Sequence, residues 1–119
     1  MIKDLAPHIV RQRLLIEGIY ERTVDEVAVL DYFEQLLTGL GMTAAGDSIV
    51  NSSLDQGKPE NQGVEAFIPL IESGIALYTW ESSRFLSLIV YTCKACNNKT
   101  ALAITQEFFQ LSEMEYKAS

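Results

Sequence analysis

The chain has 119 residues, the length of one domain, and 48% of them are hydrophobic, as is ordinary for a globular protein. Nine Lys and Arg residues against sixteen Asp and Glu residues give a net charge of −7 and a pI near 4.6. Because nucleic acids and anionic membranes attract positive surfaces, this balance argues against both partners. Since we find neither an apolar stretch near the ~20 residues that span a bilayer nor a signal-peptide pattern, we expect one cytoplasmic domain over residues 1–119.

The first expected elements are a strand and a helix. Residues 8–20 are rich in β-branched and aliphatic side chains, which predicts a strand that opens with His8. Residues 24–38 predict a helix, because apolar residues recur there at steps of three and four. The buried face of this helix is expected to consist of Val27, Leu30, Phe33, Leu37 and Leu40.

Both ends of this helix carry recognisable signals. Thr23 and Glu26 have the spacing of a capping box, in which each side chain satisfies a free backbone N–H. Gly39 and Gly41 would supply the left-handed conformation that ends a helix.

The middle of the sequence predicts a run of strands. They are expected at 43–52, 64–71, 75–80 and 85–93, with an exposed polar loop at 55–63. In the last strand, one face would hold Phe85, Ser87, Ile89, Tyr91 and Cys93, and the other Leu86, Leu88, Val90 and Thr92. Pro69 lacks a backbone N–H, so the strand 64–71 should lie at a sheet edge or be bulged there.

The last elements complete an α+β pattern. Asn98 would cap a helix over 99–110, whose apolar stripe is Ala101, Ile104, Phe108 and Leu111, and residues 114–119 would add a short strand. The order β-α-β-β-β-β-α-β predicts a two-layer sandwich, with a mainly antiparallel sheet and two helices on one face. The other face carries enough apolar residues to need a partner, for which a homodimer is the usual solution.

Cys93 and Cys96 form a C-x-x-C pair between a strand and a helix, which is the context of a thioredoxin-type redox site. Only residues 97–119 follow it, fewer than a thioredoxin core requires. A zinc site needs about four ligands, and His8, which we expect to be structural, is the one histidine. We therefore expect free thiols and no metal site.

The tetrapeptide Ile-Glu-Ser-Gly at 71–74 lies between two apolar runs and raises two interpretations. Gly and Ser form tight turns, and a Glu keeps the tip of a hairpin soluble. The alternative is that the Glu72–Ser73 peptide bond is itself the functional group.

The second interpretation follows from a resemblance. The chain resembles the prokaryotic S-adenosylmethionine decarboxylases, small pyruvoyl-dependent lyases of polyamine and spermidine biosynthesis. The matching segments are His8, I-E-S at 71–73, T-W at 79–80 and V-Y-T-C at 90–93. Ser73 and Cys93 are twenty positions apart, as the cleavage serine and the catalytic cysteine of that family are.

The resemblance implies an autocatalytic cleavage. In that family the serine hydroxyl attacks the carbonyl of the preceding glutamate to form an ester, and elimination then cuts the chain and leaves a pyruvoyl group. Here Ser73 would be the pyruvoyl precursor, Glu72 would end the first chain, and Cys93 would be the proton donor. The pyruvoyl group acts as an electron sink for loss of CO2, so the implied substrate is S-adenosylmethionine or a related amino acid.

The sequence departs from the family pattern at several positions. Tyr78 replaces the histidine that takes the proton during elimination, and the ordinary pKa of a tyrosine, near 10, makes it a poor base at neutral pH. Ser82 occupies the place of the acid that holds the ribose, with Glu81 shifted beside it. Glu65 replaces a serine that assists processing, and Ile89 replaces an aspartate. The expected substrate-binding residues are Trp80, Glu81, Ser82 and Glu65.

Two hypotheses therefore remain open, and whether the protein is an enzyme depends on them. In the first, it cleaves itself and acts as a pyruvoyl-dependent decarboxylase, as the retained Glu72, Ser73 and Cys93 suggest. In the second, it is a non-processing homologue that serves as a binding or regulatory subunit, beside an active paralogue. The changes at Tyr78 and Glu65 favour the second hypothesis and predict slow or absent cleavage.

Overall fold

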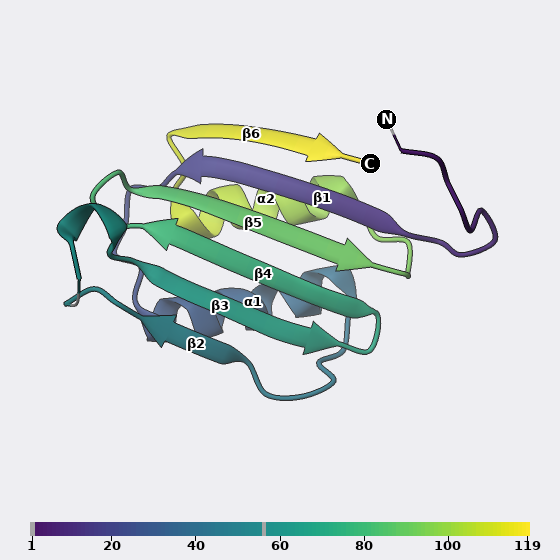
Figure 1. Cartoon of the computed structure of the whole chain (residues 1–119), viewed down its shortest axis with the longest axis horizontal. Coiled ribbons are helices and arrows are strands. Elements are labelled where there is room, and N and C mark those ends of the chain that lie inside the picture. Colours follow the sequence, from purple (N-terminus) through teal and green to yellow (C-terminus); the bar gives the residue numbers. More distant parts are fainter. Residues whose placement is uncertain (1, 56) are drawn as a thin grey trace.

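The computed structural model describes residues 2–55 and 57–119 and shows a six-stranded antiparallel sheet with two helices on one face (Figure 1). The strands are β1 (Gln12–Ile19), β2 (Ile49–Ser52), β3 (Val64–Leu70), β4 (Ser73–Trp80), β5 (Phe85–Thr92) and β6 (Glu113–Ala118). The helices are α1 (Glu26–Leu40) and α2 (Asn98–Phe109), with a short 3-10 helix, η1, at Pro59–Asn61. The two-layer α+β sandwich predicted from the sequence is confirmed.

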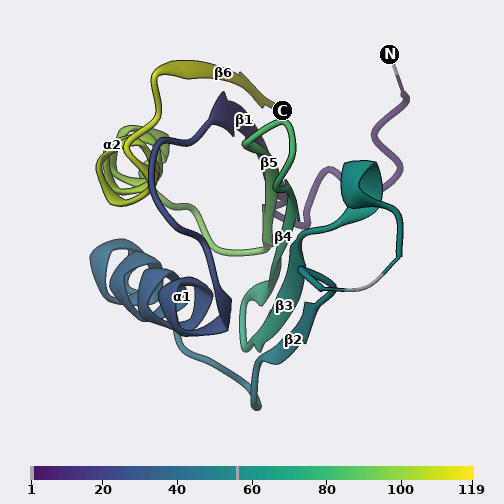
Figure 2. The ribbon, with the colours of Figure 1, turned by 90° about the vertical axis from the view of Figure 1, so that its left-hand side faces the viewer.

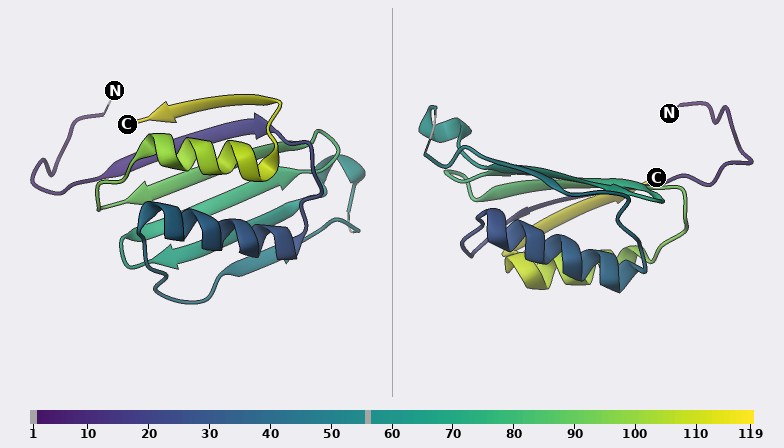
Figure 3. Two further views of the ribbon diagram at one scale, coloured as in Figure 1. Left: turned by 180° about the vertical axis from the view of Figure 1, so that it is seen from behind. Right: turned by 90° about the horizontal axis from the view of Figure 1, so that it is seen from below.

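The strand order in the sheet is β2-β3-β4-β5-β1-β6, so the first strand lies between two strands from the second half of the chain. Every pair of neighbouring strands is antiparallel. Both α-helices cross the same face, which we call the inner face, and neither α1 nor α2 lies on the opposite or outer face (Figures 2 and 3). Within the described residues, no helix is long and apolar enough to cross a membrane.

The core lies between the helices and the inner face. Alternate strand residues point toward the helices, and several are at most 1% exposed: Leu14, Ile16, Val64, Ile75, Leu77, Leu86, Leu88 and Val90. Tyr32 and Phe33 of α1 and Phe109 of α2 complete this core. Burying a side chain of this size stabilises the fold by about 1.5–3 kcal/mol, so the inner face is the main source of stability.

The predicted buried face of α1 is partly wrong. Val27 and Leu30 are 67% and 47% exposed, whereas Tyr32 and Leu36 are fully buried. Both sets of residues satisfy the helical period, and contacts with α2 select between them. The Tyr32 ring lies 4.5 Å from the Phe109 ring, between centroids, so the aromatic pair faces inward.

The predicted ends of both helices also need correction. The side chain of Asp25, not Thr23, caps α1 by accepting the Ala28 N–H at 2.9 Å, and Asn97, not Asn98, caps α2. Gly41 ends α1 with a φ of 67°. Gly39 instead lies inside α1, where a Cβ would come within 2.3 Å of Ile104 Cδ1, so its missing side chain lets the helices approach.

Several strand boundaries differ from those expected. β1 starts at Gln12, and His8 lies in an exposed turn before it, because hydrogen bonds rather than β-branched composition define the start of the strand. β2 covers only the end of the predicted 43–52, and Ala44 forms an isolated bridge to Leu70. β3 is an interior strand, but β2 pairs with it only as far as Phe67. Beyond Phe67, Pro69 faces the segment before β2, and the Ala45 N–H donates to the Pro69 carbonyl. The missing N–H of Pro69 therefore costs no hydrogen bond between paired strands.

Candidate active site on the outer sheet face

The Glu72–Ser73 bond lies in a tight hairpin between β3 and β4. Leu70 pairs with Ser73, so the turn itself contains only Ile71 and Glu72. Ser73 has a φ of 140°, a region that residues with a side chain rarely adopt. Such a conformation stores strain and persists only where the surroundings impose it, and strained residues cluster at functional sites.

Backbone hydrogen bonds impose this conformation from two sides. The Cys93 N–H donates to the Glu72 carbonyl oxygen at 2.8 Å. The Thr43 N–H donates to the Glu72 carboxylate at 3.2 Å, and the Ile71 N–H donates to the Thr43 carbonyl at 3.0 Å. The Glu72 carbonyl is thus held and polarised by an amide. Sequence reasoning missed Thr43, because its contribution is made by backbone atoms that any residue carries.

Cys93 lies beside this hairpin, directly after β5, where Thr92 pairs with Ser73. Its side chain is exposed, whereas Cys96 is half-buried, and burial raises the pKa of the Cys96 thiol. Both are free thiols. Cys93 does not lie at a helix N-terminus, because α2 begins only at Asn98. Within residues 2–55 and 57–119, no cluster of three potential metal ligands occurs.

A shallow apolar cavity of about 270 Å³ adjoins Ser73 on the outer face. It is lined by Phe67, Ser73, Gly74, Ala76, Ile89 and Tyr91. A Cβ on Gly74 would lie 2.7 Å from the Phe67 ring, so the ring fills the space that a side chain at position 74 would take. Phe67 is a site residue that sequence reasoning missed, although its place in the alternation of β3 put it on the outer face.

Tyr78 and Glu65 form a second group on the same face. They are cross-strand partners and line a cavity of about 140 Å³ with Ile49, Asn51 and Phe67. Tyr78 is five residues from Ser73 along β4, which at ~3.4 Å per residue is about 17 Å. Within one chain, Tyr78, at the position of the family's base, therefore lies far from the candidate cleavage site at Glu72–Ser73.

The remaining predicted site residues lie at the far end of β4. Trp80 is 37% exposed on the outer face, and its ring lies 5.5 Å from that of Phe85, between centroids. Ser82 is exposed in the following turn. Glu81 accepts a hydrogen bond from the Tyr20 hydroxyl at 2.8 Å and lies 3.7 Å from the Arg84 guanidinium. Burial, together with the hydrogen bond to Glu81, raises the pKa of Tyr20, so this carboxylate is engaged within the protein.

The register of the sheet arranges the outer face in rows that cross the strands. The hairpin row is Arg13, Tyr91, Gly74 and Pro69, and the middle row is Leu15, Ile89, Ala76, Phe67 and Ile49. The acidic row is Glu17, Ser87, Tyr78 and Glu65, and the terminal row is Ile19, Phe85 and Trp80. The face therefore carries one basic residue, Arg13, in the hairpin row, is apolar in the middle row and carries two glutamates in the acidic row.

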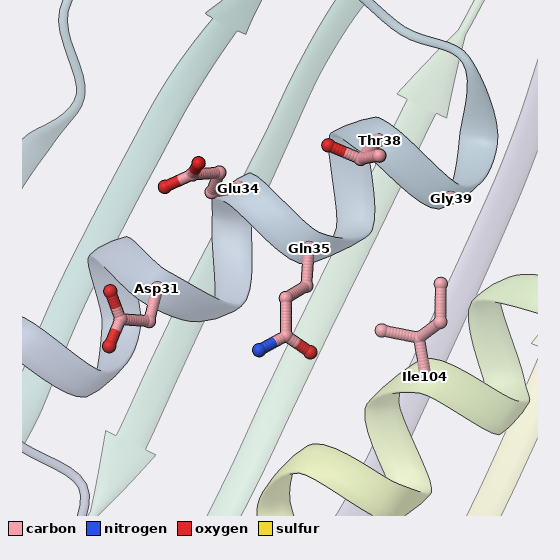
Figure 4. Close-up of a pocket in the computed structure, with 6 residues that line it drawn as sticks. All are labelled: Asp31, Glu34, Gln35, Thr38, Gly39 and Ile104. Carbon is pink, nitrogen blue, oxygen red and sulfur yellow. The ribbon is translucent and has the colours of Figure 1, made fainter.

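A wider groove lies on the opposite side of the molecule, between α1 and α2 (Figure 4). It has a volume of about 550 Å³ and is lined by Asp31, Glu34, Gln35, Thr38, Gly39 and Ile104. It contains none of the candidate catalytic, cleavage or substrate-binding residues named from the sequence. The strained serine, the exposed thiol and the polarised carbonyl all meet at the hairpin instead, so we place the candidate site there.

Comparison with known proteins identifies the fold and the family of the chain. The fold is that of a decarboxylase: the chain is similar to the crystal structure of the adenosylmethionine decarboxylase from Aquifex aeolicus VF5. The TM-score is 0.74 at 16% identity, over 93% of this chain and 89% of that one. The profile of a family described as S-adenosylmethionine decarboxylase matches residues 15–119, and the chain belongs to that family. A search of curated proteins found no match.

Proposed function

We propose that this protein cleaves itself between Glu72 and Ser73 and then acts as a pyruvoyl-dependent decarboxylase of S-adenosylmethionine or a related amino acid in polyamine synthesis. The observation that carries the proposal is the hairpin geometry. A strained Ser73 follows a carbonyl whose oxygen accepts the Cys93 N–H. A turn that only joined two strands would not need the strained backbone at Ser73.

The first step is an attack by Ser73 Oγ on the Glu72 carbonyl carbon. Negative charge then develops on the carbonyl oxygen, where the Cys93 N–H already donates, so this amide stabilises the transition state. The bond between the Glu72 carbonyl carbon and the Ser73 nitrogen breaks, the nitrogen takes the hydroxyl proton, and an ester remains. Cleavage of that bond also releases the backbone strain at Ser73.

The second step needs a base for the Ser73 Cα proton. Elimination breaks the ester C–O bond and releases the Glu72 carboxylate, and hydrolysis of the resulting dehydroalanine frees ammonia and leaves the pyruvoyl group. That group supplies the electron sink for loss of CO2. Cys93 is exposed beside it to return a proton to the product, and Phe67 and Tyr91 form an apolar wall.

The base must come from outside this hairpin, and a homodimer through the outer face would supply it. A two-fold axis along the middle row would lay the hairpin row of one copy over the acidic row of the other. Gly74, directly after Ser73, would then face Tyr78 of the second copy, and Arg13 would face its Glu17. Exposed apolar residues in the middle of the face support such a contact: Ile49, Phe67 and Ile89 are 41–61% exposed.

A second candidate function is favoured by the chemistry of the acidic row. A tyrosine and a glutamate stand where processing calls for a good base and a serine, and Glu81 is engaged with Tyr20. Without cleavage the protein would serve as a binding or regulatory subunit, beside an active paralogue.

Intact-mass measurement of the purified protein tests the choice. Self-cleavage gives pieces of 72 and 47 residues, the smaller one carrying a carbonyl that borohydride traps, and it is abolished by Ser73→Ala. The cleaved protein should then release labelled CO2 from S-adenosylmethionine or from another amino acid. A chain that stays at 119 residues after prolonged incubation would contradict the decarboxylase and favour the binding subunit.

The dimer has a separate test in a charge exchange. Arg13→Glu places two acids against each other in the proposed interface and should raise the dissociation constant about tenfold, as expected for ~1.4 kcal/mol. Adding Glu17→Arg should restore it. An equal loss from both single variants without rescue in the double variant would contradict this packing.

A further inference from the structure

The residues before β1 form an arm whose apolar side chains are largely exposed. The arm, residues 2–10, leaves the sheet at the hairpin end and rises on the side away from the helices (Figures 2 and 3). Its exposed apolar residues are Ile2 (79%), Leu5 (82%), Ile9 (48%) and Val10 (57%).

This arm has a defined shape. The Asp4 carboxylate pairs with the Arg11 guanidinium and accepts the Ala6 N–H at 2.9 Å. The Ile9 N–H donates to the Ala6 carbonyl at 2.9 Å, which closes a turn. The Ala6 N–H and Arg11 lower the pKa of Asp4, so the carboxylate stays charged and paired. A segment that is already ordered loses little conformational entropy when it docks.

A complementary surface lies at the opposite end of the outer face. There the exposed Trp80 and the half-buried Phe85 form an aromatic pair in the terminal row. A cavity of about 150 Å³ adjoins it, and its lining combines Ile19, Phe85 and Met114 with three carboxylates, Glu17, Glu113 and Glu115. This end of the face would therefore accept a segment that is both apolar and basic.

The arm and the strand start that follows it have that composition. Residues 1–13 hold Lys3, Arg11 and Arg13 against a single acid, Asp4, which is a net charge of +2. The rest of the chain holds six Lys and Arg against fifteen acids, a net charge of −9. Charge complementarity of this kind steers association and fixes its register.

We propose that the arm of each copy crosses to a second copy of this chain and packs Ile9 and Val10 against its Trp80–Phe85 pair, with Lys3 toward its Glu17–Glu113–Glu115 cluster. The inference rests on the dimer of the proposed function, whose two-fold axis brings the arm to this end of the face. If Arg13 lies over Glu17 of the second copy, residue 11 reaches the level of its Ile19 in the terminal row, and Ile9 and Val10 follow at that end.

Such a contact would have a consequence for the site. Trp80 is an expected substrate-binding residue. An arm packed on it would therefore close the cavity between the two copies on the side that faces solvent. Each site would then combine the hairpin of one copy, the acidic row of the other, and an arm.

Photo-crosslinking of the full chain tests the arm. p-Benzoylphenylalanine is placed at Ile9, and, as a matched control, at Val27, which is 67% exposed on α1, away from the outer face. Equal amounts of ¹⁵N-labelled and unlabelled protein are mixed, irradiated and digested, so that mass spectrometry separates crosslinks between copies from crosslinks within one copy. We expect crosslinks between copies from position 9 to peptides that contain Ile19, Trp80 or Phe85, and none from position 27.

Three results would overturn the proposal: a monomer, crosslinks only within one copy, or crosslinks between copies that avoid the terminal row. Intact mass of the same samples reports cleavage independently. An uncleaved protein with the expected crosslinks would support the arm contact and contradict the decarboxylase. A cleaved dimer without those crosslinks would support the decarboxylase and contradict the arm contact. As a second measurement, Ile9→Asp with Val10→Asp should raise the dimer dissociation constant at least tenfold, and Val27→Asp should leave it unchanged.

Discussion

The two faces of the sheet are built from the same strands and differ in almost every other respect. On the inner face, Ile75 and Leu77 of β4 are fully buried under the helices. On the outer face, Tyr78 and Trp80 of the same strand are 40% and 37% exposed. Adjacent residues thus serve different purposes: the inner set holds the fold together, and the outer set is free to carry a site and a partner.

The sharpest test of this division uses two neighbouring residues. Leu77→Ala removes a fully buried side chain and should lower the free energy of unfolding by about 2–5 kcal/mol. Tyr78→Ala removes a half-exposed one and should cost less than about 1 kcal/mol. Urea unfolding of both variants measures the difference. Equal losses would mean that the outer face is as much a part of the folding core as the inner one.

The second test changes the chemistry of the outer face alone. Tyr78→His supplies a base that titrates near neutral pH, and a well-placed general base contributes about 10²–10⁴-fold in rate. Self-cleavage should rise partially with this change and further with Glu65→Ser, while stability stays within about 0.5 kcal/mol. Intact mass against time is the measurement. If neither change alters the rate of self-cleavage, the residues of the acidic row take no part in processing.

The third test uses pH and the tyrosines buried beneath the sheet. Burial raises the pKa of Tyr32, and burial with the Glu81 hydrogen bond raises that of Tyr20, so both stay protonated in the fold above the unfolded value near 10. The unfolded state then binds fewer protons, and the unfolding free energy falls as pH rises above about 10, by up to ~1.4 kcal/mol per pH unit for each group. In urea titrations at about pH 8, 10 and 11, Tyr32→Phe should flatten this decline. An unchanged slope would contradict the assignment.

The smallest expected effect separates the two cysteines. Cys96→Ser replaces a half-buried thiol by a group of similar size, so stability and any cleavage should change by less than about 0.5 kcal/mol or twofold. Cys93→Ser should leave stability equally unchanged and reduce decarboxylation. Equal functional loss from both variants, or stoichiometric zinc in the purified protein, would revive a paired role for the cysteines.

Periodicity predicted the fold well because the strands alternate cleanly. The division of β5 into a buried set and an exposed set, for example, is the one seen in the structure. The buried face of α1 was less accessible to sequence reasoning, since Val27 and Tyr32 both lie on plausible stripes. What decides between them is the packing of α2, which comes from about seventy residues further along the chain.

The site was predictable only in its residue types. The positions of Ser73 and Cys93 followed from the family pattern, but the amide that holds the Glu72 carbonyl left no trace in the sequence. Glu81 lies beside the position expected to hold the ribose, but its carboxylate accepts a hydrogen bond from Tyr20. That hydrogen bond joins the residues after two different strands, and the pattern of strands does not predict it. Backbone donors and loop geometry are set by tertiary contacts rather than by local composition.

The strand order has a final consequence for a chain cut at residue 72. The first fragment would hold β1, β2 and β3 and the second β4, β5 and β6, yet the sheet places β1 between β5 and β6, and β4 beside β3. The fragments would interlock through three ladders and could not separate without melting the sheet. Two halves expressed as separate polypeptides should therefore reassemble by fragment complementation, and a maturation cut could open the backbone without opening the protein.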